Sequence, residues 1–471
     1  MTTIIFVCGI VASFLLIYGL KQMSSPLTAV RGIVVAGYGM LVVVLASFLY
    51  AFGIEADAEA NLVVNLTLVL LAIAIGAGWA WWTGRRVALT KMPQMTALFN
   101  GMGGGSAAAI AASELFGTSS HGVVSMTVVM VGALIGSVAL SGSIIAWAKL
   151  DGRMRKPWRV KGQSVLNSAL FLVLIVLGAY LVFVTQNTAA GVIFFVLALA
   201  LGVTVTAPIG GADMPVIIAL FNALTGLAVA LDGYVLQNAA LMIAGMVVGS
   251  SGLLLTVVMA KAMNRSITNV LFSNFGDAAI EQQGDIQGEM KPVEASDAAT
   301  TMRYADKVII APGYGLAAAQ AQQKLYEFVQ LLQAADVEVK FAIHPVAGRM
   351  PGHMDVLLAE AGVPYDLLFD LDEINEEFKT ADVALVIGAN DVVNPAARTN
   401  KASPIYGMSI LNVDQAKQVY VIKRGQGRGY AGIENELFYA DNCNMVYGDA
   451  KDVIGQMVQA IKPLVASDKA A

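Results

Sequence analysis

The chain has 471 residues, of which 57% are hydrophobic and only 13% are charged, about half the charged share of an average soluble protein. Residues 1–260 hold 18 of the charged residues and a net charge of +4, whereas residues 261–471 hold 45 and a net charge of −9. This break predicts a membrane-embedded first part and a water-soluble second part. The acidic second part excludes nucleic-acid binding, because the phosphate backbone requires dense basic residues. Cys8 and Cys443 have no partner at disulfide or metal-ligand spacing, so neither a disulfide nor a metal site is expected.

Nine apolar segments in residues 1–260 are long enough to cross about 30 Å of hydrocarbon as helices. The fourth is the least apolar, because it contains Asn100 and a glycine-rich run at 101–105, and it requires close packing among other helices. The first lacks a basic leader and a small-residue cleavage site, so we expect it to be retained as a helix. The nine segments are 4–20, 33–53, 62–82, 92–113, 123–148, 165–184, 190–207, 214–231 and 237–259.

Basic residues are concentrated in the odd-numbered loops between these segments, most of all in residues 149–161, whereas the second loop is acidic. Positively charged loops face the cytoplasm, so nine segments predict an outer N-terminus and a cytoplasmic C-terminal domain. The tryptophans agree with this orientation, since they lie near the predicted cytoplasmic ends of the segments, as aromatic residues do at membrane interfaces. They are Trp79, Trp81, Trp82, Trp147 and Trp158.

Polar side chains in apolar segments are candidates for an ion path, because burying them in a bilayer is costly. Asp213, Asn100 and Asn222 are such candidates. Asp213 lies at the mouth of a segment, where water reaches it, and the two asparagines are equally compatible with a structural role. Serine and threonine residues such as Thr206 are more typical of hydrogen bonds between helices.

Residues 261–300 lose the apolar pattern and predict a linker, with a short helix near 265–272 at the membrane surface. From residue 301 onward, short apolar runs alternate with helical stretches, which is typical of a Rossmann-like, doubly wound parallel sheet. The predicted fold is therefore a polytopic α-helical membrane domain of about nine spans followed by an α/β domain of residues 301–471. The predicted strands are 307–313, 337–343, 383–387, 409–413, 419–423 and 445–447, and the predicted helices run from about 319 to 335 and over 352–361, 372–380 and 449–462.

The sequence Gly313-x-Gly315-x-x-Ala318 follows the first predicted strand and precedes a helix, which is the dinucleotide-binding fingerprint. Its glycines let the backbone approach a pyrophosphate, and the start of the helix supplies donors and positive potential. The alternative is that Gly315 only begins the helix.

Basic residues near the predicted strand ends favour NADP over NAD. NAD sites place an acidic residue at the end of the second strand, but this strand ends in His344 and no acid follows it. Instead the chain offers Arg349, and Lys423-Arg424 with Arg428 beyond them, which suit a 2′-phosphate. The alternative is that these are solvated charges at the edge of the sheet.

Two further loops follow predicted strands. Gly388–Asp391 ends a buried strand, and Gly425–Gly432 contains four glycines in eight positions. The second loop has the composition of a mobile lid over a ligand, although an ordinary flexible loop has the same composition.

Several long stretches of the chain resemble the beta subunit of proton-translocating NAD(P) transhydrogenase. They occur in one order from the middle of the membrane part to the C-terminus, whereas the first segments match mainly in number and character. These stretches are Gly210–Pro215, Val248–Gly252, Lys261–Ser266, Pro312–Gly315, Ile343–His353, Val386–Ala396, Tyr430–Gly432 and Gly448–Lys451.

The resemblance implies an Si-Re-specific, proton-translocating NAD(P)⁺ transhydrogenase in the inner (cytoplasmic) membrane of a bacterium. The C-terminal domain of such a subunit binds NADP(H) and exchanges hydride with NAD(H) on a separate alpha subunit, in a dimer of alpha–beta units. This agrees with the single dinucleotide fingerprint in the chain.

The resemblance also implies roles for individual residues. Asp213, Asn222 and residues 249–252 match positions tied to proton coupling, and Asp391 is expected to sense protonation. The cofactor contacts implied are Gly313, Tyr314, Gly315, Ala318, Val346, Ala347, Gly348, Arg349, Met350, Pro351, Gly388, Ala389, Asn390, Asp391, Val392, Gly407, Met408, Lys423, Arg424, Gly425, Gln426, Gly427, Arg428, Gly429, Tyr430, Asp449 and Ala450.

The chain departs from part of the family at Asn100, where some members carry a histidine that can titrate. The proton-carrying group is then expected in the helices of the partner subunit, in water held by Asn100 and Asn222, or at Asp213. Two other functions compete with the transhydrogenase: a transporter or channel gated by a nucleotide-sensing domain, and a non-catalytic membrane scaffold.

Overall fold

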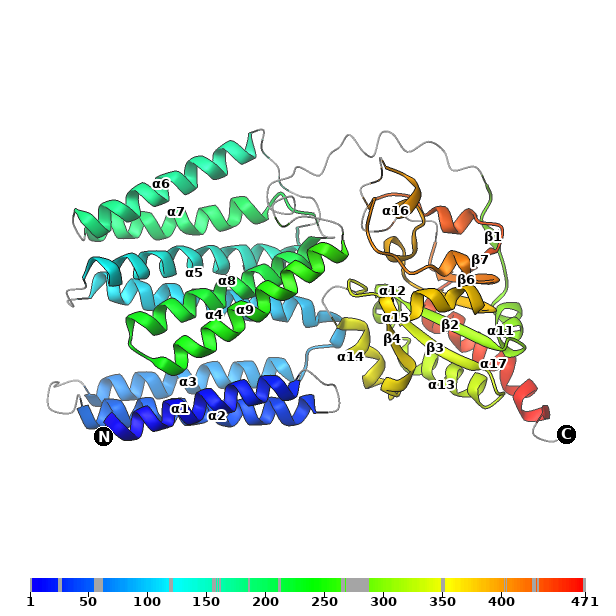
Figure 1. Cartoon of the computed structure of the whole chain (residues 1–471), viewed down its shortest axis with the longest axis horizontal. Helices are drawn as coiled ribbons and strands as arrows, with labels where there is room; N and C mark the ends of the chain where they lie inside the picture. The colour runs from blue at the N-terminus through cyan, green and yellow to red at the C-terminus, as the bar shows by residue number, and fades with distance from the viewer. Residues whose placement is uncertain are drawn as a thin grey trace. The chain divides into compact units, whose positions relative to one another are not determined.

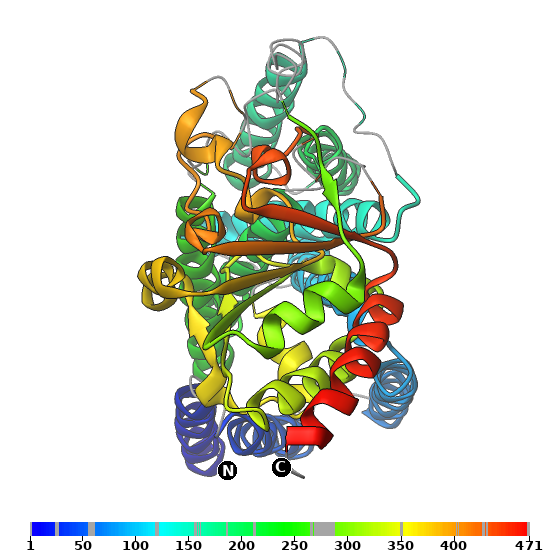
Figure 2. The same cartoon turned by 90° about the vertical axis from the view of Figure 1, so that its right-hand side faces the viewer.

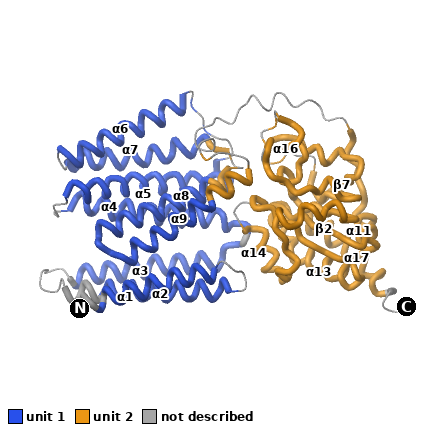
Figure 3. The backbone as a smooth tube through the Cα atoms, viewed as in Figure 1, with its two compact units in different colours: residues 1–208, 217–255 blue, residues 209–216, 256–471 orange. Residues whose placement is uncertain are grey.

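The computed structural model describes residues 2–23, 28–54, 62–117, 122–154, 158, 160, 162–184, 187–210, 213–263, 267, 288–348, 352–401, 403, 405–425, 429 and 432–468. The chain divides into two compact units (Figure 3). Residues 1–208 and 217–255 form the first, here called the membrane unit, and residues 209–216 and 256–471 form the second, the sheet unit.

Long helices make up the membrane unit, and nine of them occur in the described residues before residue 263 (Figure 1). Eight are long and apolar enough to cross a bilayer, and α4 falls short because of its glycines and polar residues. The prediction of a polytopic helical domain is confirmed. The helices are α1 (Thr2–Met23), α2 (Ala29–Ile54), α3 (Leu62–Gly84), α4 (Met92–Phe116), α5 (Val123–Leu150), α6 (Gln163–Phe183), α7 (Thr188–Thr206), α8 (Met214–Val235) and α9 (Ala239–Ala262).

Helix α4 packs closely against α5 through small residues. A Cβ atom built on Gly104 would lie 2.9 Å from Ala139 Cβ and 3.0 Å from the carbonyl oxygen of Gly136. A Cβ atom on Gly136 would lie 2.9 Å from the backbone nitrogen of Ala108. Glycine at these positions lets the two backbones approach, as is usual where helices pack inside a membrane. This close packing on α5 explains why α4 is part of the membrane unit although it is less apolar than the other helices.

Helices α8 and α9 cross in the same manner. Gly226 lies against Gly249, and a Cβ atom on Gly233 would lie 2.5 Å from the backbone nitrogen of Met242. Gly252 faces Ala223, with 2.8 Å between its built Cβ atom and the backbone nitrogen. The repeated glycines therefore let α8 and α9 pack closely between Ala223 and Gly233 of α8 and between Met242 and Gly252 of α9.

The sheet unit contains one parallel sheet of seven strands in the order β1-β7-β6-β5-β2-β3-β4. The chain moves outward from β2 to β3 and β4, then returns to the other side of β2 and continues through β5, β6 and β7. This is the Rossmann order with β1 added at one edge, so the predicted doubly wound fold is confirmed. The strands are β1 (Lys291–Pro292), β2 (Lys307–Pro312), β3 (Glu338–Ile343), β4 (Leu368–Asp370), β5 (Val383–Ile387), β6 (Gln418–Lys423) and β7 (Cys443–Tyr447).

Helices cover one face of the sheet, and short helical turns cover the other. Figure 2 shows the C-terminal helix α17 on the same side of the sheet as the green α11 and α13. The helices of the unit are α11 (Ala295–Arg303), α12 (Tyr314–Ala318), α13 (Gln322–Gln333), α14 (His353–Glu360), α15 (Leu371–Ile374), α16 (Ala396–Thr399) and α17 (Ala450–Asp468), with 3-10 turns η3 (Tyr365–Leu367), η4 (Asn375–Thr380), η5 (Asp391–Val393), η6 (Val413–Gln415) and η7 (Glu436–Tyr439).

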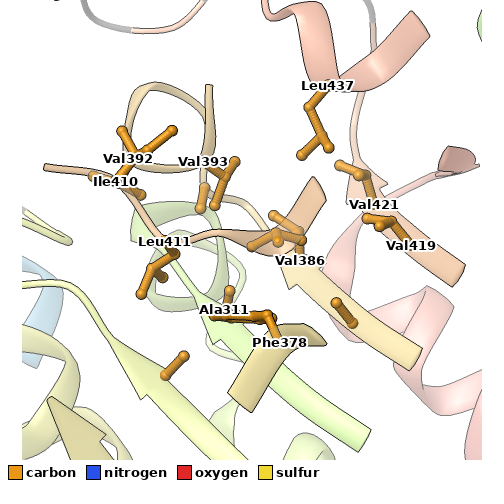
Figure 4. Close-up of a cluster of buried hydrophobic side chains, with 14 of the residues drawn as sticks. Ala311, Phe378, Val386, Val392, Val393, Ile410, Leu411, Val419, Val421 and Leu437 are labelled. Carbon is orange, nitrogen blue, oxygen red and sulfur yellow. The ribbon is translucent and has the colours of Figure 1, made fainter. Parts of the chain in front are cut away.

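The second face of the sheet packs on a buried apolar cluster (Figure 4). Alternate strand residues point to this face, as the pleat requires, among them Ala311, Val386 and Val421. The turns contribute Phe378 and Leu437 opposite them. The loops at the carboxyl ends of the strands therefore start from a well-packed apolar core.

Two predictions about secondary structure are corrected. The segment 409–413 is not a strand, because side chains hold its backbone: Asn375 Nδ2 donates to the carbonyl oxygen of Ile410 at 2.9 Å, and Asn375 Oδ1 accepts from the Asn412 backbone nitrogen at 2.9 Å. The helix predicted at 372–380 is mostly the 3-10 turn η4, whereas the helix predicted from about 319 to 335 is α13. The helix predicted near 265–272 lies, apart from Ile267, outside the described residues.

Candidate functional site

The carboxyl ends of four neighbouring strands form one row at the edge of the sheet. Pro312 of β2 pairs with Ile387 of β5, Ile387 pairs with Ile422 of β6, and Lys423 pairs with Tyr447 of β7. Continuing these registers by one residue places Gly313, Gly388 and Lys423 side by side. This edge contains the reversal point of the strand order, between β2 and β5, where ligands bind in sheets of this kind.

Glycines allow the loops after β2 and β5 to cross at this point. A Cβ atom on Gly313 would lie 2.5 Å from Ala389 Cα, and one on Gly315 would lie 2.6 Å from Gly388 Cα. Gly388 has a φ of +63°, a left-handed conformation that favours glycine. The Gly315 backbone nitrogen donates to the Gly388 carbonyl oxygen at 3.0 Å. The fingerprint glycines thus fix the contact between two strand ends, beyond any role they have toward a ligand.

The helix that begins within the fingerprint is short. Helix α12 has only five residues, Tyr314–Ala318, and Gln320 has a φ of +50° before α13 begins at Gln322. The expected helix start with its positive potential is therefore limited to little more than one turn, and backbone groups of the two crossing loops provide the rest of the edge.

The loop after β5 is tied to the segment that follows the glycine-rich loop. Asn435 Nδ2 donates to the Asn390 carbonyl oxygen at 2.9 Å, and Asn394 Nδ2 donates to the Glu434 carbonyl oxygen at 3.0 Å. Gly429 lies directly against Asn390 and Asp391, so a side chain at this position would collide with both. The structure therefore places Gly429 of the glycine-rich loop beside the Asp391 carboxylate.

Lys423 and Arg424 end β6 next to the glycine crossing. Lys423 Nζ lies 4.5 Å from the centre of the Phe438 ring, and burial lowers the pKa of this ammonium group, against the opposing effect of Asp391 and Glu434. Arg424 Nη2 lies 2.6 Å from Asp449 Oδ2. The Arg424 side chain is 63% exposed, so this ion pair is open to water and replaceable.

Asp449 also begins α17. Its Oδ1 accepts from the Lys451 backbone nitrogen at 3.0 Å, which caps the start of that helix. At the preceding position the Gly448 backbone nitrogen donates to the Lys423 carbonyl oxygen at 3.0 Å and extends the ladder between β6 and β7. One carboxylate thus links the end of β6 to the start of α17.

The loop after β3 is organised by a buried histidine. His344 Nδ1 accepts from the Val346 backbone nitrogen at 3.2 Å, and Nε2 donates to the Ser409 carbonyl oxygen at 2.7 Å. A neutral ring satisfies both bonds, and burial lowers the pKa of His344 to about 4. Gly348 has a φ of +96° and lies against His353, whose ring centre is 6.4 Å from that of Tyr314.

The remaining predicted contact residues divide by burial. Ala318 is exposed and Tyr314 is half-buried, whereas several others are packed into the interior and can offer a ligand mainly backbone atoms. Gly407 has a φ of +77° and donates its backbone N–H to the Ala397 carbonyl oxygen at 2.7 Å. The buried residues are Ala347, Ala389, Val392, Met408 and Ala450. The predicted contacts Arg349, Met350, Pro351, Gln426, Gly427, Arg428 and Tyr430 lie outside the described residues.

In the membrane part, Asn100 of α4 is hydrogen-bonded to α8, the helix that also contains Asn222. Asn100 Nδ2 donates to the Ile218 carbonyl oxygen at 3.2 Å, and Thr225 Oγ1 donates to the Asn100 carbonyl oxygen at 3.4 Å. Asn222 is half-buried one turn beyond Ile218 on the same face of α8. Asp213 immediately precedes α8 but is buried, with 2% of its surface exposed, so the expectation that water reaches this carboxyl group is wrong.

Sequence reasoning missed two buried titratable groups. Asp232 was placed in a loop because the eighth segment was ended at residue 231, but it belongs to α8 and only 3% of its surface is exposed. His344 was noted only as the end of a strand, and its bond to Ser409 joins segments that are 65 positions apart. Extending the eighth apolar segment by a few residues would have included Asp232. No local sequence signal indicates that His344 bonds to Ser409.

Comparison with known proteins decides the family. A family model described as NAD(P) transhydrogenase beta subunit matches residues 5–460. The chain belongs to this family. The NAD(P) transhydrogenase subunit beta of Rhodospirillum rubrum is 45% identical over 470 residues, which cover 96% of this chain and 98% of that protein. A strain-level sequence from the same species has the same identity and coverage.

Membership of the transhydrogenase beta subunits makes the chain one subunit of an enzyme complex that acts on nicotinamide nucleotides. The designation beta also implies an alpha subunit as its partner. Together with the eight apolar helices, it identifies a multi-pass membrane protein. The resemblance inferred from sequence motifs is confirmed.

Proposed function

We propose that the sheet unit binds NADP(H) at the carboxyl edge of β2, β5, β6 and β7. The observation that carries this proposal is the row of strand ends in which the glycine crossing of Gly313 and Gly388 lies next to Lys423 and Arg424. Glycines admit a pyrophosphate to the backbone, and the two adjacent cations distinguish a 2′-phosphate from a hydroxyl group.

The residues of the edge fit this ligand. Arg424 would exchange Asp449 for a phosphate, because the ion pair is exposed and contributes little on its own. Lys423, whose ammonium group is partly desolvated, would regain a full counter-charge from the same phosphate. Asp391 lies beneath Gly429 and would report the protonation state of the site to the glycine-rich loop. The nicotinamide ring supplies the hydride chemistry, and the protein supplies orientation and electrostatics.

In the full complex, we propose Si-Re hydride exchange with NAD(H) on the alpha subunit, coupled to proton translocation through the membrane unit. The assembly is a dimer of alpha–beta units in the bacterial inner membrane, with the N-terminus outside and the sheet unit in the cytoplasm. Loops rich in basic residues support this orientation. Residues 1–260 form the translocating domain, 261–300 the linker and 301–471 the nucleotide-binding domain of this proposal. The end of this linker already belongs to the sheet, because β1 (Lys291–Pro292) pairs with β7.

Removing the two cations tests the nucleotide site. In the full chain, purified with its alpha partner, Lys423→Ala combined with Arg424→Ala should weaken NADPH binding by about 100-fold or more, because each charge-assisted bond contributes about 1.5–3 kcal/mol. Binding is measured by titrating nucleotide fluorescence, with NADH as the reference ligand. Hydride exchange with an oxidised NAD analogue should fall in parallel.

The matched control removes two lysines elsewhere on the sheet unit. Lys324 and Lys379 form exposed pairs with carboxylates three positions away, and replacing both by alanine gives the same change in net charge. This control should bind NADPH as the wild type does. An NADPH affinity that the combined Lys423→Ala and Arg424→Ala substitutions leave unchanged would refute the proposed site.

A further inference from the structure

Helix α8 carries a buried carboxyl group at each end. Asp213 precedes its first residue and Asp232 lies near its last turn, and both are almost inaccessible to solvent. Because α8 has 22 residues, its ends lie about 33 Å apart. Asn222 and the contact of Asn100 with Ile218 lie between them.

Asp232 is packed tightly against α5. Its Oδ1 lies 3.3 Å from the Cβ position of Gly132 on α5, so a side chain larger than hydrogen at 132 would press on the carboxyl group. Its Oδ2 is buried, and no hydrogen-bond partner for it exists among the described residues. A carboxylate in such a place has lost its hydration without compensation, and binding a proton removes that cost.

Glu114 is the charged neighbour of Asp232. It lies near the end of α4, is only half-buried, and acts on Asp232 through its negative charge. The other charged residues of the helices around Asp232, Lys149 on α5 and Lys261 on α9, are at the far ends of those helices, about 25 Å or more away along the helix axes. Tyr234, two positions from Asp232, is exposed.

The bound species is a proton rather than a metal ion. A metal site needs several oxygen, nitrogen or sulfur ligands, and no group of three or more such titratable residues occurs in the described part of the chain. Two carboxyl groups, one buried and one half-exposed, instead suit the uptake of one proton and its passage to water.

We propose that Asp232 is a proton-binding residue of the membrane unit and that Glu114 exchanges protons between Asp232 and the solvent at the ends of α4 and α8. The proposal rests on the proposed coupling of hydride exchange to proton translocation. It supplies an ionisable group within the beta chain itself, at the end of α8 opposite to Asp213. Such a group is needed because Asn100 cannot titrate.

The test uses the complete alpha–beta complex in proteoliposomes, with proton movement followed by a pH-sensitive dye and hydride exchange followed by absorbance. Asp232→Asn, which keeps the shape but cannot titrate, should lower the number of protons moved per hydride exchanged about 10-fold. Asp232→Glu should restore most of the ratio, and Glu114→Gln should slow proton uptake. Infrared difference spectra recorded across a pH titration should show a protonated-carboxyl band that is absent in Asp232→Asn and shifted in Asp232→Glu.

Asp151→Asn is the matched control, because this carboxylate follows the last residue of α5 and pairs with Arg153 at 2.8 Å. It should pump as the wild type does. An Asp232→Asn complex with an unchanged ratio and an unchanged infrared band overturns the role of Asp232 and leaves the proposed function intact. A wild-type complex that exchanges hydride without moving protons overturns the coupling itself, and a requirement for sodium ions in place of protons overturns the choice of ligand.

Discussion

His344 makes the stability of the sheet unit depend on pH, because its ring is buried. The pKa of His344 falls from an ordinary value of 6.5 to about 4 because the ring is buried. The unfolded chain therefore takes up a proton below pH 6.5 that the folded chain refuses until about pH 4. The contribution of neutral His344 to the stability of the sheet unit is therefore fully present above pH 6.5. It decreases by up to about 3 kcal/mol as the pH falls from 6.5 to about 4.

Hydrogen exchange of the backbone amides of β3 and β5 in the intact chain checks this prediction. After correction for the intrinsic pH dependence of exchange, protection should decrease between pH 6.5 and 4.5. The variant His344→Gln should have lower protection at pH 7 but a flatter pH dependence. A wild-type profile as flat as that of the variant would contradict the assignment to His344.

Gly388 allows a second prediction at the scale of one residue. The substitution Gly388→Ala places a Cβ atom against Gly315 in a left-handed backbone conformation, and should cost about 2 kcal/mol or more of stability. Thermal unfolding and NADPH titration of the intact complex measure the effect. Gly455→Ala on α17, where the Cβ atom meets nothing within 4 Å, should leave both unchanged; an equal loss in the two variants would exclude a local cause.

Some residues of the site could be predicted from the sequence because their signal is local. Gly313, Gly315 and Lys423 follow strands at recognisable spacing, and the structure places them on one edge. The pairing of Arg424 with Asp449 could not be predicted, because it depends on the register between β6 and β7. Asp232 was missed because hydropathy marks the end of an apolar segment, whereas the helix continues past it.

At the scale of elements, glycines determine how the membrane helices pack. Gly226 on α8 lies against Gly249 on α9 without space for a side chain. The substitution Gly226→Leu should therefore separate the two helices and cost about 1–3 kcal/mol. Resistance of the purified complex to thermal unfolding in detergent measures the loss. Gly37→Leu on α2, where the Cβ position is open, is the control and should behave as the wild type does.

Strands with strong apolar runs were predicted correctly, and weak or side-chain-supported segments were not. Periodicity identified β2, β5 and β6 to within a residue or two, because burial on both faces leaves a continuous apolar run. The segment 409–413 has the same apolar character but is held by Asn375 and His344 in place of a neighbouring strand. Hydrophobicity alone does not distinguish these two environments.

At the scale of the whole molecule, the distribution of basic loops predicts a cytoplasmic sheet unit. An epitope appended after Ala471 should be accessible to antibody in inside-out vesicles and protected in right-side-out vesicles. An epitope before Met1 should show the reverse pattern. Accessibility of both ends from the same side would contradict the proposed number of membrane crossings, because nine spans place the ends on opposite sides.

The close crossing of the loops after β2 and β5 has an evolutionary consequence. Gly315 and Gly388 each occupy the space into which a side chain on the other would grow, so neither can be enlarged at the expense of its neighbour. A lineage that replaced one of them would have to rebuild the backbone of both loops at once. The two positions should therefore be inherited as a pair, which makes their joint presence a better marker of this domain in distant sequences than either glycine alone.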